Sequence, residues 1–498
     1  MLTALVFIPL LGAVLLLAVP GRSERWLRTV AGGVSLIPIA LCAIAWARFR
    51  GAGGFEQVER APWIPTLGAA YRLGVDGISL PLVAMTAVLF AAAILYPVDL
   101  RGRGRAYYAL FLFLETASLG VFLALDLLLF YVFFDLSIVG MYFLIGVWGH
   151  GEGARRAALK FFIYTLGGSL AILLAILALY LASGDGVHVA RTFDMAVLIA
   201  RRPLDGAGLM PALAFAGFAL GFAIKTPMFP VHTWLPPAHV DAPAPASTIL
   251  AGVLLKMGTY GFLRVLLSMM PQTFARFALP LAILATVSIL YGALVALAQS
   301  NLKRRIAYTS VNHMGYVILG TAAAASVVTG HTAARATALT GAVVEMVAHG
   351  LITGALFLLS GSIWERARTY ELADFGGLAG RAPVMTAFAV LAAFASLGLP
   401  ALAGFVAEFQ VFVGTFSAYP WLAGVGLLGI LITAALFLQL IQRLFLGELP
   451  ARWRTWTDLS WRELVAIAGL LALVIAIGVI PAPLLAVIGS GVGPLVAR

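Results

Sequence analysis

Residues 221–261 read GFAIKTPMFPVHTWLPPAHVDAPAPASTILAGVLLKMGTYG, and this stretch decides the fold. An apolar helix carrying Lys225 is interrupted at Pro227 and Pro230, and a second apolar helix carries Lys256. A lysine at the centre of a membrane helix costs roughly 3 kcal/mol on insertion scales, and a broken helix is tolerated there only beside a cavity or within protein. The combination indicates a membrane protein that handles ions.

The composition of the whole chain agrees with a membrane protein. Of the 498 residues, 62% are hydrophobic and only 11% are charged, which excludes an ordinary soluble protein. The net charge of +11 comes from basic clusters between apolar runs, which is where the signals for membrane topology lie. We therefore expect no binding of nucleic acid. The single cysteine, Cys42, excludes an internal disulfide and a cysteine-held cluster. Residues 1–19 lack a basic start and are interpreted as a retained helix.

Apolar runs of about 20 residues predict about fourteen transmembrane helices in one all-α transmembrane domain, residues 1–498. The predicted spans are 2–20, 27–47, 77–97, 106–125, 127–149, 158–183, 209–228, 246–270, 277–298, 305–328, 334–362, 382–418, 421–447 and 463–490.

Basic clusters lie in the odd-numbered loops between these spans, which the positive-inside rule assigns to the cytoplasm. Both termini are then predicted on the outer side of the membrane. Two long even-numbered loops also carry arginines, together with acids. The odd-loop clusters are Arg22/Arg25/Arg28, Arg101/Arg103/Arg105, Arg155/Arg156/Lys160, Lys303/Arg304/Arg305, Arg366/Arg368/Arg381 and Arg452/Arg454/Arg462.

A second helix interruption is predicted within residues 393–410, AFASLGLPALAGFVAEFQ, where glycines flank Pro400 before Glu408. The two interruptions are separated by about five spans, which is the pattern of an inverted repeat. We therefore predict two inverted five-helix repeats. The first is 106–270, with its broken helix near Pro227, and the second is 277–447, with its broken helix near Pro400.

Asp135 stands about nine residues into its span, roughly 13 Å deep at the rise of an α-helix. A carboxylate at that depth must be paired or protonated, and Lys225 beside the helix break is its natural partner. The alternatives are a structural ion pair and a group that relays protons.

Four further polar groups lie within apolar spans. Lys256 has no acid one helical turn away, and Glu408 follows the second break as a terminal acid. His313 and His349 each lie on a polar stripe, the second with Glu345 one turn before it. Each histidine is interpreted either as a proton relay or as a satisfied core residue.

Other polar residues favour structural interpretations. His232 and His239 have no cysteine or second close acid to complete a metal site, so structural use in the loop is favoured. Lys303 is expected to anchor its span at the membrane surface, and Arg264 to extend towards the interface. No nucleotide-binding or zinc-protease motif occurs, so nucleotide-driven transport lacks support.

Five segments together resemble the proton-pumping antiporter-like subunits of respiratory complex I. They are residues 223–264, which include most of the opening stretch, KRRIAYTSVNHMGY (303–316), AHGLITGALFLLSG (348–361), ERARTYELADFGGLA (365–379) and PALAGFVAEF (400–409). The resemblance covers nearly the whole chain. Glutamate rather than lysine at position 408 resembles the M-type chains of that family. The resemblance implies a proton relay formed by Asp135, Lys225, Lys256, His313, His349 and Glu408.

Three positions depart from the family pattern. Asp135 stands where glutamate is usual, which shortens the side chain by one methylene and puts its distance to Lys225 in question. Pro237 replaces a common aspartate, and Glu345 replaces a frequent glutamine, which adds a carboxylate one turn from His349.

The resemblance also implies a setting for the chain. It predicts a multi-pass protein of the bacterial plasma membrane that moves protons, contacts lipids and assembles with other membrane-arm subunits, notably L-type and N-type antiporter-like chains. No cofactor is expected in this chain, because NADH, FMN, iron–sulfur clusters and quinone are expected in partner subunits. The alternatives are a cation/proton antiporter chain of the Mrp type and a membrane-arm subunit of an energy-converting hydrogenase.

Overall fold

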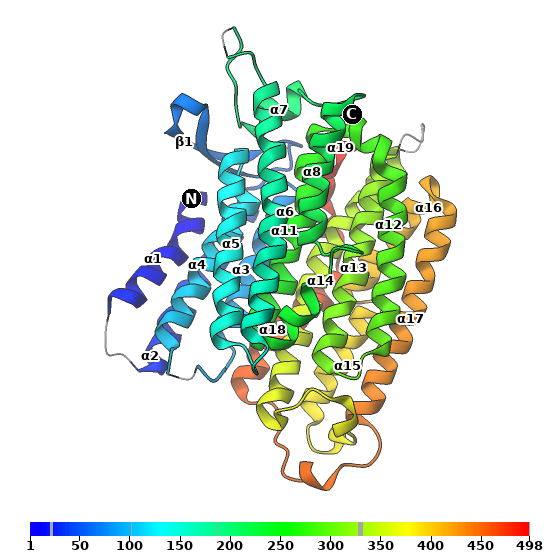
Figure 1. Ribbon diagram of the computed structural model, residues 1–498. Coiled ribbons are helices and arrows are strands. Elements are labelled where there is room, and N and C mark those ends of the chain that lie inside the picture. Colours follow the sequence, from blue (N-terminus) through cyan, green and yellow to red (C-terminus); the bar gives the residue numbers. More distant parts are fainter. Residues whose placement is uncertain (20–22, 101, 187, 327–331, 498) are drawn as a thin grey trace.

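The computed structural model describes the chain except residues 20–22, 101, 187, 327–331 and 498. Figure 1 shows an elongated helix bundle, which confirms the predicted all-α membrane fold. Within the described residues, nine helices are long and apolar enough to cross a membrane, and six shorter apolar helices accompany them. Each of the predicted spans contains one helix or a pair of helices.

The helices of the first part of the chain are α1 (Leu2–Ala18), α2 (Glu24–Arg48), α3 (Ser79–Leu95), α4 (Gly104–Leu123), α5 (Leu127–Trp148), α6 (Ala154–Ala182), α7 (Met195–Arg201) and α8 (Leu209–Lys225). Those of the second part are α9 (Leu235–Asp241), α10 (Ala244–Ile249), α11 (Leu255–Gly261), α12 (Pro271–Ala298), α13 (Leu302–Ala325), α14 (Thr332–Ala367), α15 (Pro383–Ser396), α16 (Ala403–Ala418), α17 (Pro420–Phe445), α18 (Trp461–Val479) and α19 (Ala482–Val496).

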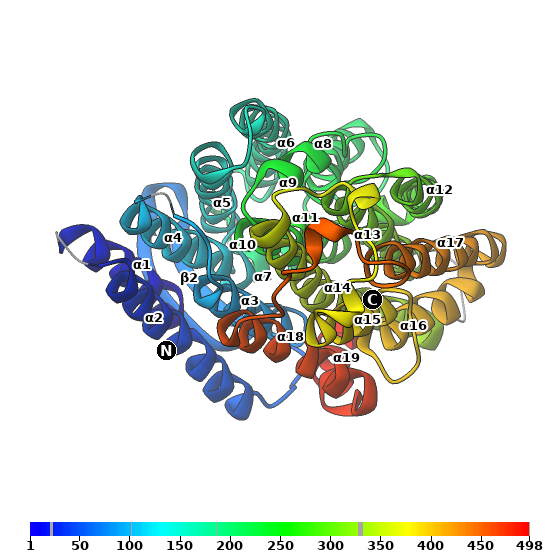
Figure 2. The same ribbon diagram turned by 90° about the horizontal axis from the view of Figure 1, so that it is seen from below.

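Two spans form the centre of the bundle. The most apolar part of the span Ala244–Leu267, which contains α10 and α11, is completely buried, and so is that of α14. In the corresponding parts of α2, α17 and α18 only a third of the residues are buried. Figure 2 shows α10, α11 and α14 enclosed by the other helices. Polar side chains on these two spans therefore face protein and not lipid.

Both predicted helix interruptions are present, and a third occurs where a continuous span was predicted. Helix α8 ends at Lys225, and the span 382–418 separates into α15 and α16. The predicted span 463–490 is wrong in its continuity, because it separates into α18 and α19 at Pro481. Proline has no backbone N–H to donate within a helix, which explains the break at this point. The division into inverted repeats stays a prediction.

A β-hairpin was not predicted from the sequence. Strand β1 (Glu56–Ile64) pairs with the antiparallel strand β2 (Ala69–Val75), with Ala61 opposite Tyr71. Gly68 begins the return of the chain with φ of +68°, a left-handed conformation that glycine adopts at little cost. The hairpin lies on the upper side of the bundle in Figure 1.

Loops that carry the described members of the predicted cytoplasmic clusters meet at one end of the bundle, the lower end in Figure 1, while Arg22 and Arg101 lie outside the described residues. The backbone N–H of His150 donates to the carbonyl of Asp241 at 2.6 Å, and that of Leu302 donates to Tyr370 at 2.8 Å. Arg366 reaches across to the Thr457 carbonyl at 2.8 Å. The two ends of the described chain lie towards the opposite, upper side.

Arg264 does not extend to the interface as expected from the sequence. Its side chain is only 3% exposed, and its Nη2 lies 2.5 Å from Oδ2 of Asp76, which precedes α3. Arg264 also donates from Nε to the Tyr260 hydroxyl at 2.9 Å. The expectation failed because it placed Arg264 by its distance along the helix, whereas the buried carboxylate of a distant segment holds the guanidinium inside the protein.

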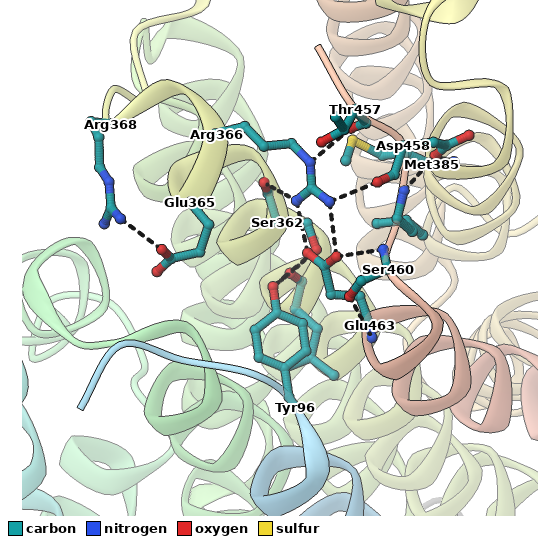
Figure 3. Close-up of polar contacts among 12 residues, drawn as sticks. Tyr96, Ser362, Glu365, Arg366, Arg368, Met385, Thr457, Asp458, Ser460 and Glu463 are labelled. Carbon is teal, nitrogen blue, oxygen red and sulfur yellow. Dashed lines mark hydrogen bonds and ion pairs between the residues drawn. The ribbon is translucent and has the colours of Figure 1, made fainter. Parts of the chain in front are cut away.

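Asp76→Asn tests this buried pair. Removing one partner leaves an uncompensated buried charge, so we expect the substitution to destabilise the chain by about 3–5 kcal/mol. Thermal unfolding of the assembled complex, followed by the loss of this subunit, measures the effect. Glu365→Gln is the matched control, because its partner Arg368 is 56% exposed (Figure 3) and exposed pairs contribute about 1 kcal/mol or less. Equal effects of the two substitutions would contradict a stabilising role of the buried pair.

Candidate functional site

Lys225 is the last residue of α8, and its side chain is buried at the first helix interruption. Its Nζ donates to the Ser137 hydroxyl at 3.2 Å and lies 4.9 Å from the centre of the Phe134 ring. The C-terminal end of a helix carries a partial negative charge that favours a cation. The helix break therefore provides Lys225 with an electrostatic partner that a continuous helix would lack.

Asp135 does not pair directly with Lys225, contrary to the expectation from the sequence. The Ser169 hydroxyl of α6 donates to its carboxylate, and the ion pairs within the described residues do not include Asp135. Ser137 lies two residues further along α5, which turns it by about 200° on the helix, so the two side chains face different neighbours. Lys225 contacts α5 through Ser137 and not through the acid.

Lys256 is completely buried in α11, which has a π-helix on either side, Leu250–Leu254 and Phe262–Leu267. Its Nζ lies 2.6 Å from the Ala251 carbonyl and 2.6 Å from Nδ1 of His349 on α14. Single π-helical turns within α-helices frequently mark functional sites. The two central spans are thus joined through a lysine–histidine contact.

His313 on α13 is the meeting point of four polar side chains. Its Nδ1 lies 3.1 Å from Glu345 and 3.8 Å from Glu408, and its Nε2 lies 3.1 Å from the Ser396 hydroxyl. The ring centres of His313 and His349 are 5.3 Å apart. Lys256, His349, His313, Glu345 and Glu408 therefore form one buried cluster, which we call the central cluster.

The second helix interruption shapes the site around Glu408, which is buried in α16. Gly398 lies in the segment between α15 and α16 with φ of +76°. A methyl group on this residue would overlap Oε2 of Glu408. Glycine is required here both for the left-handed backbone and for the close approach of the carboxylate.

The structure thus brings together four of the six residues predicted from the sequence. Lys256, His313, His349 and Glu408 belong to the central cluster. Lys225 is not part of this cluster, but the end of α8 that carries it packs against α11, since Thr226 contacts Gly258. Asp135 is the outlying member, bonded to α6.

Three buried polar groups were missed or misplaced by reasoning from the sequence. Glu115 on α4 is completely buried, and its carboxyl oxygens have no hydrogen-bond partner within the described residues. Its position near the middle of the predicted span 106–125 was as strong a signal as that of Asp135. Lys303 is buried and not at the surface, and it bonds the Ala242 carbonyl. Ser137 gave no signal, because hydroxyls are common in membrane helices.

His232 and His239 pack against aromatic rings. The ring of His239 stacks on Phe357 with centres 4.5 Å apart, and His232 lies 5.0 Å from the Tyr291 ring. Across the described residues, no group of three histidine, cysteine or acidic side chains could hold a metal ion. The aromatic contacts agree with a structural use of these two histidines.

Residues 124–433 match the family model described as NADH:quinone oxidoreductase/Mrp antiporter, TM. The match covers more than half of the chain, and it spans both helix interruptions and every member of the central cluster. The chain belongs to this family of polytopic membrane proteins.

Its similarity within the family is to M-type chains. The chain is 39% identical to NADH-quinone oxidoreductase subunit M of Rhodobacter capsulatus, covering 100% of this chain and 96% of that protein. It is 38% identical to NAD(P)H-quinone oxidoreductase chain 4 of a Picosynechococcus species, covering 96% and 89%. These relatives confirm the M-type assignment predicted from Glu408.

Solved structures agree with the fold. A chain of respiratory complex I from Thermus thermophilus with bound NADH superimposes with a TM-score of 0.87 and 32% identity, over 100% of both chains. A chain of the Mrp complex from Dietzia superimposes with a TM-score of 0.84 but only 21% identity, over 99% and 97% of the two chains. The second likeness concerns the fold alone.

Gly398→Ala is expected to displace Glu408 and to reduce proton translocation. The left-handed backbone alone costs an alanine roughly 1–2 kcal/mol, and the added methyl overlaps the carboxylate. Proton uptake by the complex reconstituted in liposomes, divided by the amount of assembled complex, gives the measurement. Gly424→Ala is the control, since a Cβ at position 424 meets no atom within 4 Å. Parental translocation in Gly398→Ala would contradict the importance of this close contact.

Asp135→Asn is expected to damage translocation, whereas Asp135→Glu is expected to retain most of it. Asparagine removes the negative charge, while glutamate keeps it and extends the reach towards Lys225. Ser169→Ala removes the hydroxyl bonded to Asp135 but keeps the carboxylate, so it separates the hydrogen bond of the acid from its charge. If all three substitutions reduce activity equally, local packing and not charge explains the need for Asp135.

Proposed function

We propose that this chain translocates protons across the membrane as the M-type subunit of an NADH:quinone oxidoreductase. Protons would pass through the buried side chains of Lys225, Lys256, His349, His313 and Glu408. The observation that carries the proposal is the central cluster, in which successive titratable side chains are buried and lie within or near hydrogen-bond distance of one another. Family membership supports the same activity.

The contact between Lys256 and His349 is suited to proton transfer. At 2.6 Å, Nζ and Nδ1 lie within the range over which a positioned base takes a proton from an acid. The two groups cannot both carry a positive charge at low cost, because like charges at this separation repel strongly in a medium of low polarity. A proton that arrives on one group therefore favours its release from the other.

His313 connects this pair to the acids of the second half. The two nitrogens of its ring face different partners, Glu345 on one side and Ser396 on the other. An imidazole accepts a proton at one nitrogen and releases one from the other, which is the property a relay requires. Glu408, whose Oε1 lies 3.8 Å from Nδ1, is proposed to receive the proton at the second helix interruption.

Lys225 is proposed as the proton-loading group at the first interruption. Within the described residues its polar contact is with Ser137, and no direct hydrogen bond joins it to Lys256. Transfer between the two lysines therefore requires bound water, which a broken helix accommodates more readily than a continuous one. Protonation of Lys225 would also depend on the charge of Asp135, which lies two residues from Ser137 on α5.

The energy for translocation is proposed to come from redox chemistry in partner subunits that hold NADH, FMN, iron–sulfur clusters and quinone. L-type and N-type antiporter-like chains are the proposed neighbours in the membrane arm. The lower end of the bundle in Figure 1, where the basic loops meet, is proposed to face the cytoplasm of a bacterium. A Mrp-type role is less favoured, because the curated relatives described above are quinone oxidoreductase subunits.

The relay predicts that Lys225→Ala and Lys256→Ala each reduce NADH-driven translocation to about a tenth or less, since an essential proton site in the membrane is removed. The complex is expected to assemble in both variants. Fluorescence of a pH-sensitive dye in liposomes containing purified complex measures the rate. Lys160→Ala is the control, because this lysine lies near the start of α6 over the Tyr164 ring, outside the central cluster. A parental rate in either test variant would remove that lysine from the relay.

Substitutions of Glu408 distinguish a proton site from a structural hydrogen bond. Glu408→Gln preserves hydrogen bonding but cannot exchange a proton, so it is expected to abolish most translocation, whereas Glu408→Asp is expected to keep part of it. Glu408→Lys is expected to impair translocation severely. A carboxyl group without its proton is an anion, whereas a lysine amine without its proton is neutral. Near-parental translocation in Glu408→Gln, normalised to assembled complex, would favour the structural role.

A further inference from the structure

Two cavities follow one another along the groove between α2, α3 and α18. The lower cavity, of about 480 Å³, is lined by the first part of α2, by Leu95 at the end of α3 and by the first turn of α18. The upper cavity, of about 420 Å³, is lined by Trp46 of α2, by the first half of α3 and by the end of α18, with α14 behind it. Helices α2, α3 and α18 contribute to both cavities, and Pro483 and Leu484 of α19 also line the upper one. We call the face of these helices that carries the two separate cavities the groove.

The lower cavity has a basic mouth. Arg25, Arg28 and Arg462 line it, and its lining includes no acidic side chain. Arg28 donates from Nε to the Tyr108 hydroxyl at 2.9 Å, and the Arg462 guanidinium lies 5.3 Å from the Trp461 ring centre. The ion pairs within the described residues include none of the three arginines. Three positive charges thus converge on a cavity whose own lining holds no anion, and Glu24, one turn before Arg28 on α2, lies outside that lining.

The acid next to Arg462 in the sequence, Glu463, is already paired with another arginine. Arg366 of α14 donates to its two carboxylate oxygens at 2.8 Å each, and the backbone N–H of Ser460 donates to the same group (Figure 3). This bidentate pair fixes the start of α18 against the end of α14. It therefore orients the first turn of α18, with Trp461 and Arg462 at the groove, and leaves Arg462 available to an external anion.

Small residues keep the lower cavity open. A Cβ on Gly32 would meet Leu95 at 2.8 Å, whereas a Cβ on Gly33 would meet no atom within 4 Å. Around this space, Leu36 and Val465 are 49% and 52% exposed. The wall above the arginines is therefore apolar, and the upper cavity continues it with an almost entirely apolar lining that includes Pro81, Val88 and Leu473.

We propose that this groove binds an anionic phospholipid. The phosphate would contact Arg25, Arg28 and Arg462, and one acyl chain would extend along Leu36 and Val465 into the upper cavity. Arginine clusters at the end of a transmembrane helix recognise anionic lipid headgroups, and an exposed tryptophan such as Trp461 is typical of the level of those headgroups. The basic and aromatic side chains at the start of α18 and the apolar wall further along it match the headgroup and the acyl chain of a phospholipid.

Two variants remove different halves of the proposed recognition. Arg28→Gln combined with Arg462→Gln removes charge and leaves the space, whereas Gly33→Leu fills the space and leaves all three charges. Because Gly33 faces open volume, its substitution should not disturb the helix packing. Arg381→Gln combined with Arg454→Gln is the matched control, because it removes two arginines that lie outside the groove.

The assembled complex of each variant is delipidated in mild detergent and titrated with phosphatidylglycerol or phosphatidylcholine. Native mass spectrometry then counts the lipids retained on the released chain. The parental chain is expected to retain phosphatidylglycerol, and both test variants are expected to lose about tenfold or more of that affinity, while the control remains parental. Equal retention of the two lipids by the parent, or parental retention by Gly33→Leu, would overturn the proposal.

A photoreactive amino acid at position 36 identifies the occupant directly in the assembled complex. Crosslinking to a lipid is expected, and this capture should decline in the Arg28→Gln, Arg462→Gln background. Crosslinking to a polypeptide of a neighbouring subunit would show that the groove is a protein interface and would overturn the proposal. If the double variant fails to assemble, Gly33→Leu still decides the outcome.

Discussion

The cost of burying a charge where water is scarce governs this structure. Lys225, Lys256 and Arg264 are each nearly inaccessible, and each has a specific partner. The partners are the Ser137 hydroxyl, the His349 imidazole with the Ala251 carbonyl, and the Asp76 carboxylate. In a medium of low polarity an ionised ammonium or guanidinium group needs such a partner. The Arg264 pair is fixed by strong ionic bonding, whereas the contacts of the two lysines are with neutral or titratable groups, which permits exchange of protons.

The two helix interruptions determine where Lys225 and Glu408 lie. The first interruption ends α8 at Lys225, so that the negative end of the helix faces the ammonium group. The second uses Gly398 to bring the backbone against the carboxylate of Glu408, which lies in the second turn of α16. Each interruption therefore brings the backbone at a helix end close to a buried titratable side chain.

The sequence alone predicted that several charged residues are buried, but not which residues they contact. Lys225, Lys256 and Glu408 were evident because each is a charge within an apolar run. The pairing of Arg264 with Asp76, and of Asp135 with Ser169, depends on helix rotation and on segments distant along the chain, which periodicity does not encode. The β-hairpin was missed for a related reason, since its short strands lie in a polar loop that carries no apolar run. The position of Pro481 in an otherwise apolar stretch was a usable sign that was overlooked.

The enclosure of the most apolar parts of the two central spans also separates Lys256 and His349 from the mechanics of the bilayer. Transmembrane helices tilt when the hydrocarbon thickness of the bilayer changes, and the outer helices are the ones that contact the lipid acyl chains. A lysine and a histidine on two inner helices that meet no lipid keep their separation when that outer layer adapts. The chain can thus serve in membranes whose thickness varies with growth temperature without a change in the spacing on which proton exchange depends.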